Sequence, residues 1–198
     1  MDDSSAKSDA AASAQQPGFF RRWMGKLMPD SGSSDPRKLG KWGGIIAGAY
    51  LLIAAAVGVY WSNTPDHFDV RENAARYAAA TEQDVVTGTT TVATLQETIR
   101  ILLEKPGGYL HNDLFPPGVW LDNMPNWEYG VLVQSRDLAR ALREVLSRSQ
   151  SQSKEDVDLT LAEPRINFQS KSWILPASES EYRDALRFLE AYRARLAV

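Results

Sequence analysis

The chain has 198 residues, no cysteine, a formal net charge of −3 and a mean hydropathy of −0.34. The absence of cysteine excludes Cys-ligated zinc, iron–sulfur clusters and thiol catalysis. The slightly acidic balance argues against a general nucleic-acid-binding protein, which usually carries a basic face. These averages are those of an ordinary soluble domain, but they conceal one strongly apolar segment.

The first 41 residues predict a polar arm. Residues 1–16 are rich in Ser, Ala and Asp without apolar periodicity, which predicts disorder. In residues 17–28, aromatic and leucine side chains recur at helical spacing among basic ones. That pattern predicts a short helix lying on anionic lipid headgroups, with a solvated basic linker as the alternative.

A transmembrane helix is predicted over residues 42–62. No charged side chain occurs between Trp42 and Pro65, and roughly 20 apolar residues at about 1.5 Å each cross a ~30 Å hydrocarbon core. A cleaved signal peptide is the alternative, but it starts nearer the N-terminus and has a shorter apolar region. The predicted membrane-interface anchors are Trp42, Trp61, Arg37, Lys38 and Lys41.

Charge predicts the orientation of this helix. Residues 1–41 carry seven basic and five acidic side chains, whereas residues 62–198 carry fifteen basic and twenty acidic ones. The positive-inside rule therefore places the N-terminus in the cytoplasm. Residues 63–198 then form a domain on the other side, which is the periplasm if the membrane is a bacterial inner membrane.

The apolar segment contains two pairs of small residues at a spacing of four. Gly44 with Gly48, and Ala54 with Gly58, let helix backbones approach closely. They predict packing against a second copy or a partner's helix. The alternative is that small residues are simply common in bilayer helices.

Residues 63–198 predict an all-α fold, a helical bundle. Apolar side chains follow the helical period in residues 91–105, 127–149 and 178–196, and residues 66–81 predict an Ala-rich helix. Ser178 and Glu181 fit a capping box, and residues 166–176 are predicted to be extended. Residues 109–126, with three prolines, predict a long irregular loop.

Five aromatic residues gather around this loop: Tyr109, Phe115, Trp120, Trp127 and Tyr129. Interleaved with acidic and amide side chains, such rings are suited to a docking surface for a protein or a glycan. The alternative is that they close the open end of the bundle as part of its core. Both interpretations stay open at this point.

The segment His111-Asn112-Asp113, with Glu128 downstream, is the cluster with most potential for chemistry. A histidine near acids can act as a general base, but a hydrolytic zinc site commonly needs three protein ligands. The sequence has no nucleophile elbow, P-loop or dinucleotide fingerprint. We expect no catalytic residues, no metal and no cofactor; an envelope hydrolase acting near peptidoglycan through His111 is the alternative.

Two long segments resemble a bacterial family of unknown function, made of single-span inner-membrane proteins of Gram-negative bacteria. They are PGGYLHNDLFPPGVWLDNMPNWEYG, continued by VLVQSRDLARALRE, and SWILPASESEYRDALRFLEAYRARL. The resemblance covers the apolar helix and most of the chain after it. It implies an inner-membrane anchor with a periplasmic helical domain and brings no catalytic residues. Members of this family continue past the position of Val198, which implies C-terminal truncation here.

These observations together predict a non-enzymatic, membrane-anchored scaffold or accessory subunit of a cell-envelope complex. Its expected partners are the lipid bilayer and either another protein or a second copy of the chain. The contact would form through the apolar helix or the aromatic loop. Nucleic acid is not an expected partner.

Overall fold

The computed structural model describes residues 36–146 and 155–196, and within these ranges the chain forms helices and no strands, as the all-α prediction requires. In chain order the helices are α2 (Pro36–Trp61), α3 (Val70–Ala79), α4 (Thr89–Glu104), the short 3₁₀-helix η1 (Gly118–Trp120), α5 (Asn123–Ala141), the π-helical turn η2 (Leu142–Leu146), α6 (Val157–Ile166) and α7 (Ser178–Leu196). The predicted segments 1–16 and 17–28, and the last three residues of the helix predicted over 127–149, lie outside the described residues.

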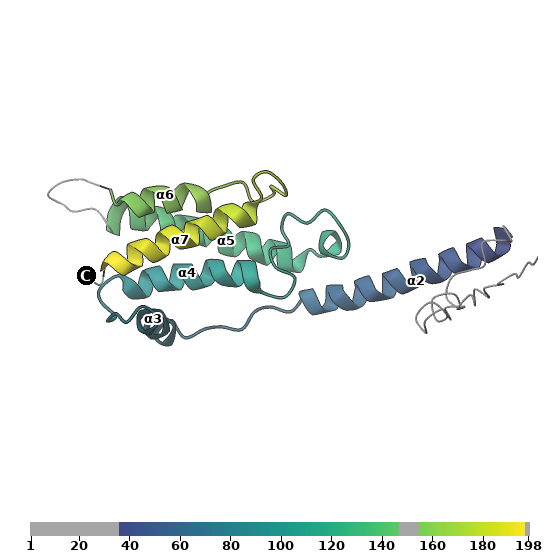
Figure 1. Cartoon of the computed structure of the whole chain (residues 1–198), viewed down its shortest axis with the longest axis horizontal. Helices are drawn as coiled ribbons and strands as arrows, with labels where there is room; N and C mark the ends of the chain where they lie inside the picture. Colours follow the sequence, from purple (N-terminus) through teal and green to yellow (C-terminus); the bar gives the residue numbers. More distant parts are fainter. Residues whose placement is uncertain (1–35, 147–154, 197–198) are drawn as a thin grey trace, which may run out of the picture. The chain divides into compact units, whose positions relative to one another are not determined.

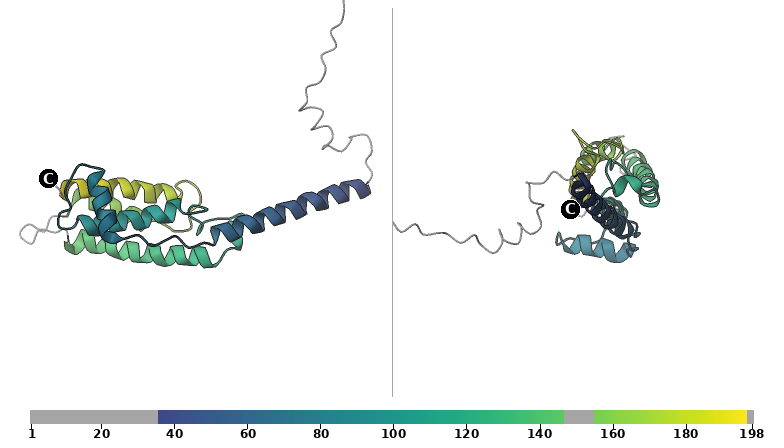
Figure 2. Two further views of the ribbon diagram at one scale, coloured as in Figure 1. Left: turned by 90° about the horizontal axis from the view of Figure 1, so that it is seen from below. Right: turned by 90° about the vertical axis from the view of Figure 1, so that its right-hand side faces the viewer.

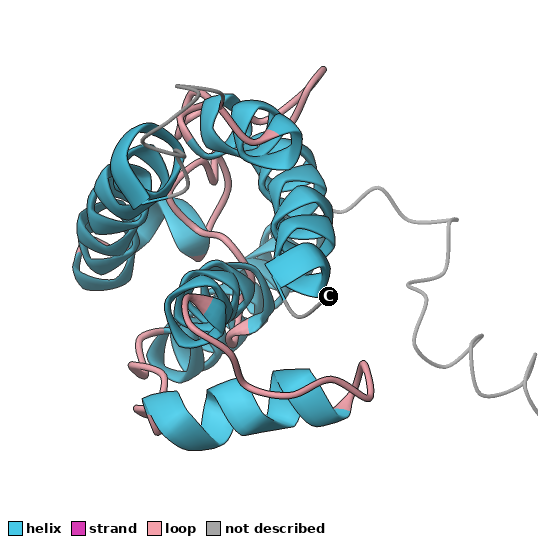
Figure 3. Ribbon diagram, turned by 90° about the vertical axis from the view of Figure 1, so that its left-hand side faces the viewer, coloured by secondary structure: helices cyan, strands magenta, loops and turns pink. Residues whose placement is uncertain are grey.

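The chain divides into two units, residues 1–48 and 49–198, and the boundary falls inside α2. In the second unit α4, α5, α6 and α7 run side by side, and α3 lies crosswise against α4 (Figure 1, Figure 3). Figure 2 shows the same bundle from two further sides. The predicted helical bundle is confirmed.

The core lies between the four long helices of the bundle. Every residue predicted on the apolar face of α4 is buried, and these residues are Val92, Leu95, Ile99, Leu102 and Leu103. Facing them from the other helices are Leu132, Leu142, Leu159, Ile166, Tyr182 and Leu189. Burying each such side chain contributes about 1.5–3 kcal/mol, so this cluster is the main source of the domain's stability.

Local signals set the ends of α3 and α4. The carboxylate of Asp69 accepts hydrogen bonds from the N–H groups of Arg71 (2.9 Å) and Glu72 (2.8 Å), so α3 begins after it. Helix α4 stops before Pro106, as predicted, and Gly107 and Gly108 follow with φ of 86° and 68°. These turns start the long loop between α4 and α5.

Helix α6 was not predicted from the sequence, and the predicted extended stretch after it is wrong. Residues 157–166 form helix α6, because the Asp156 carboxylate caps the N–H groups of Asp158 (2.9 Å) and Leu159 (3.2 Å). Pro164 lies in the last turn, where its missing N–H interrupts only one helical hydrogen bond. The stretch 166–176, predicted to be extended, is the end of α6 followed by an irregular loop.

Helix α5 also differs from its prediction. It begins at Asn123, four residues early, because Pro125 in the first turn needs no intrahelical partner for its nitrogen. After Ala141 the helix widens into the π-turn η2, which changes the register of the apolar face. Val145, predicted on that face, is consequently exposed.

Helix α7 begins at Ser178 as predicted, but the capping box is wrong. The Ser178 hydroxyl donates to the carbonyl of Gln169 (2.6 Å) and accepts the N–H of Ser172 (3.2 Å). Ser178 is buried, and its hydroxyl bonds to backbone groups of the α6–α7 loop on the side that faces the core. It ties that loop to α7 in place of capping the helix.

Candidate functional site

Two of the five loop aromatics belong to the core. Tyr109 is buried, its hydroxyl donates to the carbonyl of Ser170 (3.0 Å), and its ring meets Tyr182 edge-on with centroids 5.5 Å apart. Trp127 is half-buried and packs against the core cluster. For these two residues the interpretation as a plug of the bundle holds.

The other three aromatics point outward. Phe115 is 65% exposed and Trp120 is 55% exposed, while Tyr129 is less exposed and stacks on the His111 ring at 5.2 Å. The sequence cluster therefore divides into a buried half and a surface half. Only the surface half is available to a partner.

A buried ion pair fixes the base of the loop. Lys105, just after α4, pairs with Glu128 of α5, and neither side chain is exposed. The Glu128 carboxylate also accepts the N–H groups of Leu110 (2.9 Å) and His111 (2.7 Å). Burial raises the pKa of Glu128, against the opposing effect of Lys105 and the two amides.

Close packing inside the loop explains why residue 118 is glycine. A Cβ atom on Gly118 would lie 1.9 Å from Oδ2 and 2.7 Å from Cβ of Asp113. Because the second contact is at the base of the Asp113 side chain, rotating that side chain cannot relieve it. Residue 118 must therefore be glycine for this loop conformation to form.

Substituting Gly118 with alanine is expected to destabilise the domain by about 1–3 kcal/mol through overpacking. Gly130→Ala is the matched control, because apart from its chain neighbours and the backbone of its own helix no atom lies within 4 Å of its Cβ position on α5. In a helix interior that change is expected to stabilise by about 0.5–1 kcal/mol. Urea unfolding of both variants measures the two effects, and equal signs would contradict the packing argument.

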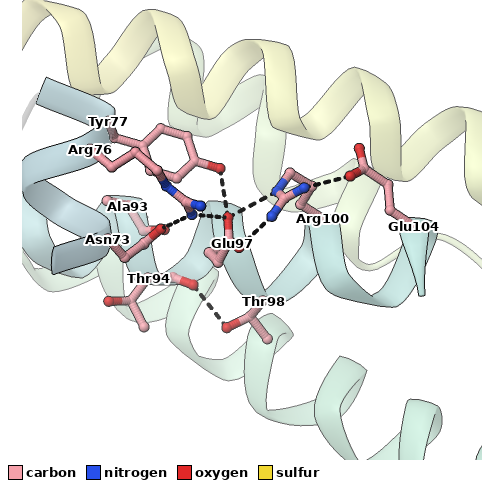
Figure 4. A network of polar contacts seen from close by, with 9 residues as sticks. All are labelled: Asn73, Arg76, Tyr77, Ala93, Thr94, Glu97, Thr98, Arg100 and Glu104. Atoms are coloured by element: carbon pink, nitrogen blue, oxygen red, sulfur yellow. Dashed lines mark hydrogen bonds and ion pairs between the residues drawn. The ribbon is translucent and has the colours of Figure 1, made fainter. Parts of the chain in front are cut away.

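A second polar cluster joins α3 to the bundle (Figure 4). Glu97 of α4 is buried and accepts from Tyr77 Oη (3.1 Å) and Arg100 Nε (2.9 Å), and it pairs with Arg76 Nη2 (3.1 Å). The hydrogen bond from Arg100 is the main cause that lowers the pKa of Glu97. Asn73 adds a bond from Nδ2 to the carbonyl of Ala93 (3.0 Å).

Arg193 of α7 completes this cluster from the other side. Its guanidinium, 2% exposed as a residue, donates to Gln96 Oε1 (3.1 Å) and to the carbonyl of Tyr77 (3.1 Å). It also lies over the Tyr77 ring at 5.2 Å. The polar cluster thus connects α3, α4 and α7, which is a structural task.

The His111 ring is occupied by structural contacts. Its Nδ1 lies 3.0 Å from the carbonyl of Pro125, which can only accept, so Nδ1 carries the proton. Nε2 is buried without a hydrogen-bond partner, and burial lowers the pKa of His111. No hydrogen bond joins either ring nitrogen to Asp113 or Glu128 in the described part of the chain. In that same part, no group of three or more histidine and acidic side chains is arranged to hold a metal ion.

The two small-residue pairs of α2 differ in what they face. A Cβ on Gly58 would contact Pro117 at 3.5 Å and Leu121 at 3.8 Å, so the Ala54–Gly58 pair faces the chain's own loop. Apart from chain neighbours and the backbone of α2 itself, no atom of the described residues lies within 4 Å of the Cβ positions of Gly44 and Gly48. Their predicted role in packing against another helix stays a prediction.

Helix α2 is long and apolar enough to cross a membrane. Its side chains are exposed along nearly its whole length, and only Ala54 and Gly58 are buried. The five predicted interface anchors all lie on this helix, with Arg37, Lys38, Lys41 and Trp42 near its start and Trp61 at its end. Trp61 is half-buried, since its ring lies against Gly107.

A family model described as "Uncharacterized protein conserved in bacteria (DUF2333)" matches residues 37–198, which is most of the chain. The chain belongs to the DUF2333 family. This confirms the resemblance to a bacterial family of unknown function. No curated protein and no solved structure matches this DUF2333 chain.

The structural roles of three charged residues in this DUF2333 domain were not predicted from its sequence, although Glu128 was considered there for chemistry. Glu97 and Glu128 are charged residues on otherwise buried helix faces. A charged residue at such a position indicates, from the sequence alone, a buried ion pair or hydrogen-bond partner. Arg193 likewise lies on the apolar face of α7. Their partners come from other helices, which spacing along one helix does not reveal.

Proposed function

We propose that this DUF2333 chain is a non-enzymatic scaffold or accessory subunit of a bacterial cell-envelope complex, anchored in the inner membrane by α2. The observation that carries the proposal is α2 itself, which from Trp42 to Trp61 is without charged side chains on any side and is exposed almost throughout. A core helix of a soluble protein would be mostly buried. The lipid bilayer is therefore the solvent that suits it.

The orientation follows from the charges on either side of α2. Basic residues outnumber acidic ones in residues 1–41, and the reverse holds in residues 62–198. By the positive-inside rule the arm is cytoplasmic and the helical domain is periplasmic.

The polar groups of the domain support a scaffold more than an enzyme. The Lys105–Glu128 pair fastens the loop, and the Glu97 cluster fastens α3. The open Gly44–Gly48 face of α2 suits a second copy of the chain or the helix of another membrane protein. The exposed rings of Phe115 and Trp120 offer a second surface, for the bilayer or for a partner.

The full-length chain is expected to stay in the membrane pellet after an alkaline carbonate wash. In gentle detergent it is expected to co-purify with another protein or a second copy, and Gly44→Leu with Gly48→Leu is expected to abolish that association. Ala49→Leu is the matched control, because residue 49 lies on a different face of the helix. Protease added to spheroplasts is expected to digest residues 63–198 and spare residues 1–41.

Two results would overturn parts of the proposal. A soluble chain that has lost residues 1–61 would mean that α2 is a signal sequence. Recovery of a bare monomer, unchanged by the leucine substitutions, would remove the scaffold role while leaving the anchor intact.

A further inference from the structure

Exposed apolar side chains gather in two loops of the helical domain. One loop lies between α4 and α5, and the other lies between α6 and α7. Leu175, in the second loop, is 90% exposed. The large exposed apolar residues of these loops are Leu114, Phe115, Val119, Trp120, Trp173, Ile174 and Leu175; we name this set the apolar rim.

The apolar rim is one surface, although its two halves are far apart in the sequence. The rings of Phe115 and Trp173 touch edge-on, with centroids 5.8 Å apart. Behind them, Asn112 Nδ2 donates to the carbonyl of Ser172 (2.9 Å), and the Tyr109 hydroxyl bonds the α6–α7 loop in the same way. These bonds hold both loops in place, so the exposed apolar side chains are fixed features of the fold.

The rim is continuous with the last turns of α2. A groove of about 480 Å³ separates that part of α2 from η1 and its flanking residues, and Trp120 lines it. Pro117 and Leu121 close its base against Gly58. The α2 residues that line the groove, with the two that follow the helix, are Ala54, Ala55, Gly58, Val59, Ser62 and Asn63.

The stretch of α2 that borders the groove indicates how deep in the membrane the rim lies. From Ala54 to Trp61 the helix rises by about 10 Å, at about 1.5 Å per residue. If Trp61 lies at the membrane interface, residues packed beside Ala54 and Ala55 lie up to that distance toward the hydrocarbon core. Interfacial protein segments bury their apolar faces about 5–10 Å into the headgroup and acyl boundary.

We propose that the apolar rim is immersed in the leaflet of the membrane from which α2 emerges into the helical domain, and that its occupant is lipid. This rests on the proposed anchor role of α2. Exposed Trp and Phe side chains favour this layer, whereas a clustered apolar patch is unfavourable in water. Lys171, exposed beside Trp173, suits the anionic headgroups that border the same layer.

The test uses spin labels on single cysteines, since the native chain has none. Full-length chain is labelled at Val119→Cys or Ile174→Cys and reconstituted in vesicles of phosphatidylethanolamine and phosphatidylglycerol. Val157→Cys is the matched control, because it is also an exposed valine (64%, against 50% for Val119) but lies on α6, away from both loops. Oxygen concentrates among acyl chains and a nickel chelate stays in water.

The ratio of oxygen to nickel collision rates at residues 119 and 174 is expected to exceed the ratio at residue 157 several-fold. Equal ratios at all three positions would overturn the proposal. It would also be overturned if the labels at 119 and 174 were shielded from both reagents, because a protein would then cover the rim. A label at Ile53→Cys separates the two proposals. If it is lipid-exposed while residues 119 and 174 are in water, the anchor stands and the rim does not.

Discussion

Replacing Glu128 with alanine is expected to lower the free energy of unfolding by about 3–5 kcal/mol, the range for breaking a buried ion pair. The Lys105 ammonium would be left buried without its carboxylate. The N–H groups of Leu110 and His111 would lose their acceptor as well. Urea unfolding of the full-length chain in detergent, followed by near-ultraviolet circular dichroism of the aromatic rings, measures the loss.

Two further variants make this expectation specific. Glu190→Ala removes an exposed carboxylate from α7 and is expected to change stability by less than about 0.5 kcal/mol. Lys105→Met combined with Glu128→Leu removes both buried charges and is expected to regain part of the loss. It leaves the two loop N–H groups unpaired, so recovery stays incomplete. A Glu128→Ala variant as stable as the Glu190→Ala control would show that the pair is not needed.

The buried position of Glu128 could have been read from the sequence, but its partner could not. Met124, Glu128 and Leu132 follow one another at a spacing of four on one face of α5, which places the carboxylate inside. Lys105 lies in the turn after α4, and it reaches Glu128 only because the long loop between the two helices folds back and places α5 beside that turn. Periodicity describes one helix at a time and carries no information on how the loop folds back.

The same reasoning explains which helices were predicted correctly. The apolar face of α4 has a clean helical period and every residue assigned to it is buried. In α6 the acidic composition and Pro164 obscured a helix that Asp156 starts by capping. The loop aromatics follow no period, so nothing in the sequence separated buried Tyr109 from exposed Phe115.

The small-residue pairs of α2 show that a sequence pattern can predict close packing correctly without identifying the segment that packs there. Close approach at Gly58 occurs as the spacing indicates, but the neighbours are Pro117 and Leu121 of the same chain. The sequence pattern specifies how closely a backbone can approach, and it does not specify whose backbone it is. For Gly44 and Gly48 the question of the neighbour is the one that the co-purification experiment answers.

Replacing Arg193 with alanine is expected to cost roughly 3–5 kcal/mol. The two shortest hydrogen bonds from this charged donor are each worth about 1.5–3 kcal/mol, and their acceptors on Gln96 and Tyr77 are left buried in the domain. A longer hydrogen bond from Arg193 to the Thr81 hydroxyl (3.4 Å) is lost as well. The stacking of the guanidinium over the Tyr77 ring is lost too. Because these groups join α7 to α3 and α4, α3 is expected to detach before the rest of the domain unfolds. Faster amide hydrogen exchange at residues 70–79 measures this detachment, and urea unfolding measures the loss of overall stability.

Arg193→Lys separates the charge from the shape of the side chain. Lysine keeps the positive charge but lacks the planar fork that reaches both acceptors and stacks on a ring. Its expected loss lies between those of Arg193→Ala and the control Arg183→Ala, which removes an exposed arginine from the same helix. If Arg193→Lys is as stable as the native chain, charge alone holds α7 to α3. If Arg193→Ala matches Arg183→Ala, the cluster in Figure 4 does not need α7 to fasten α3.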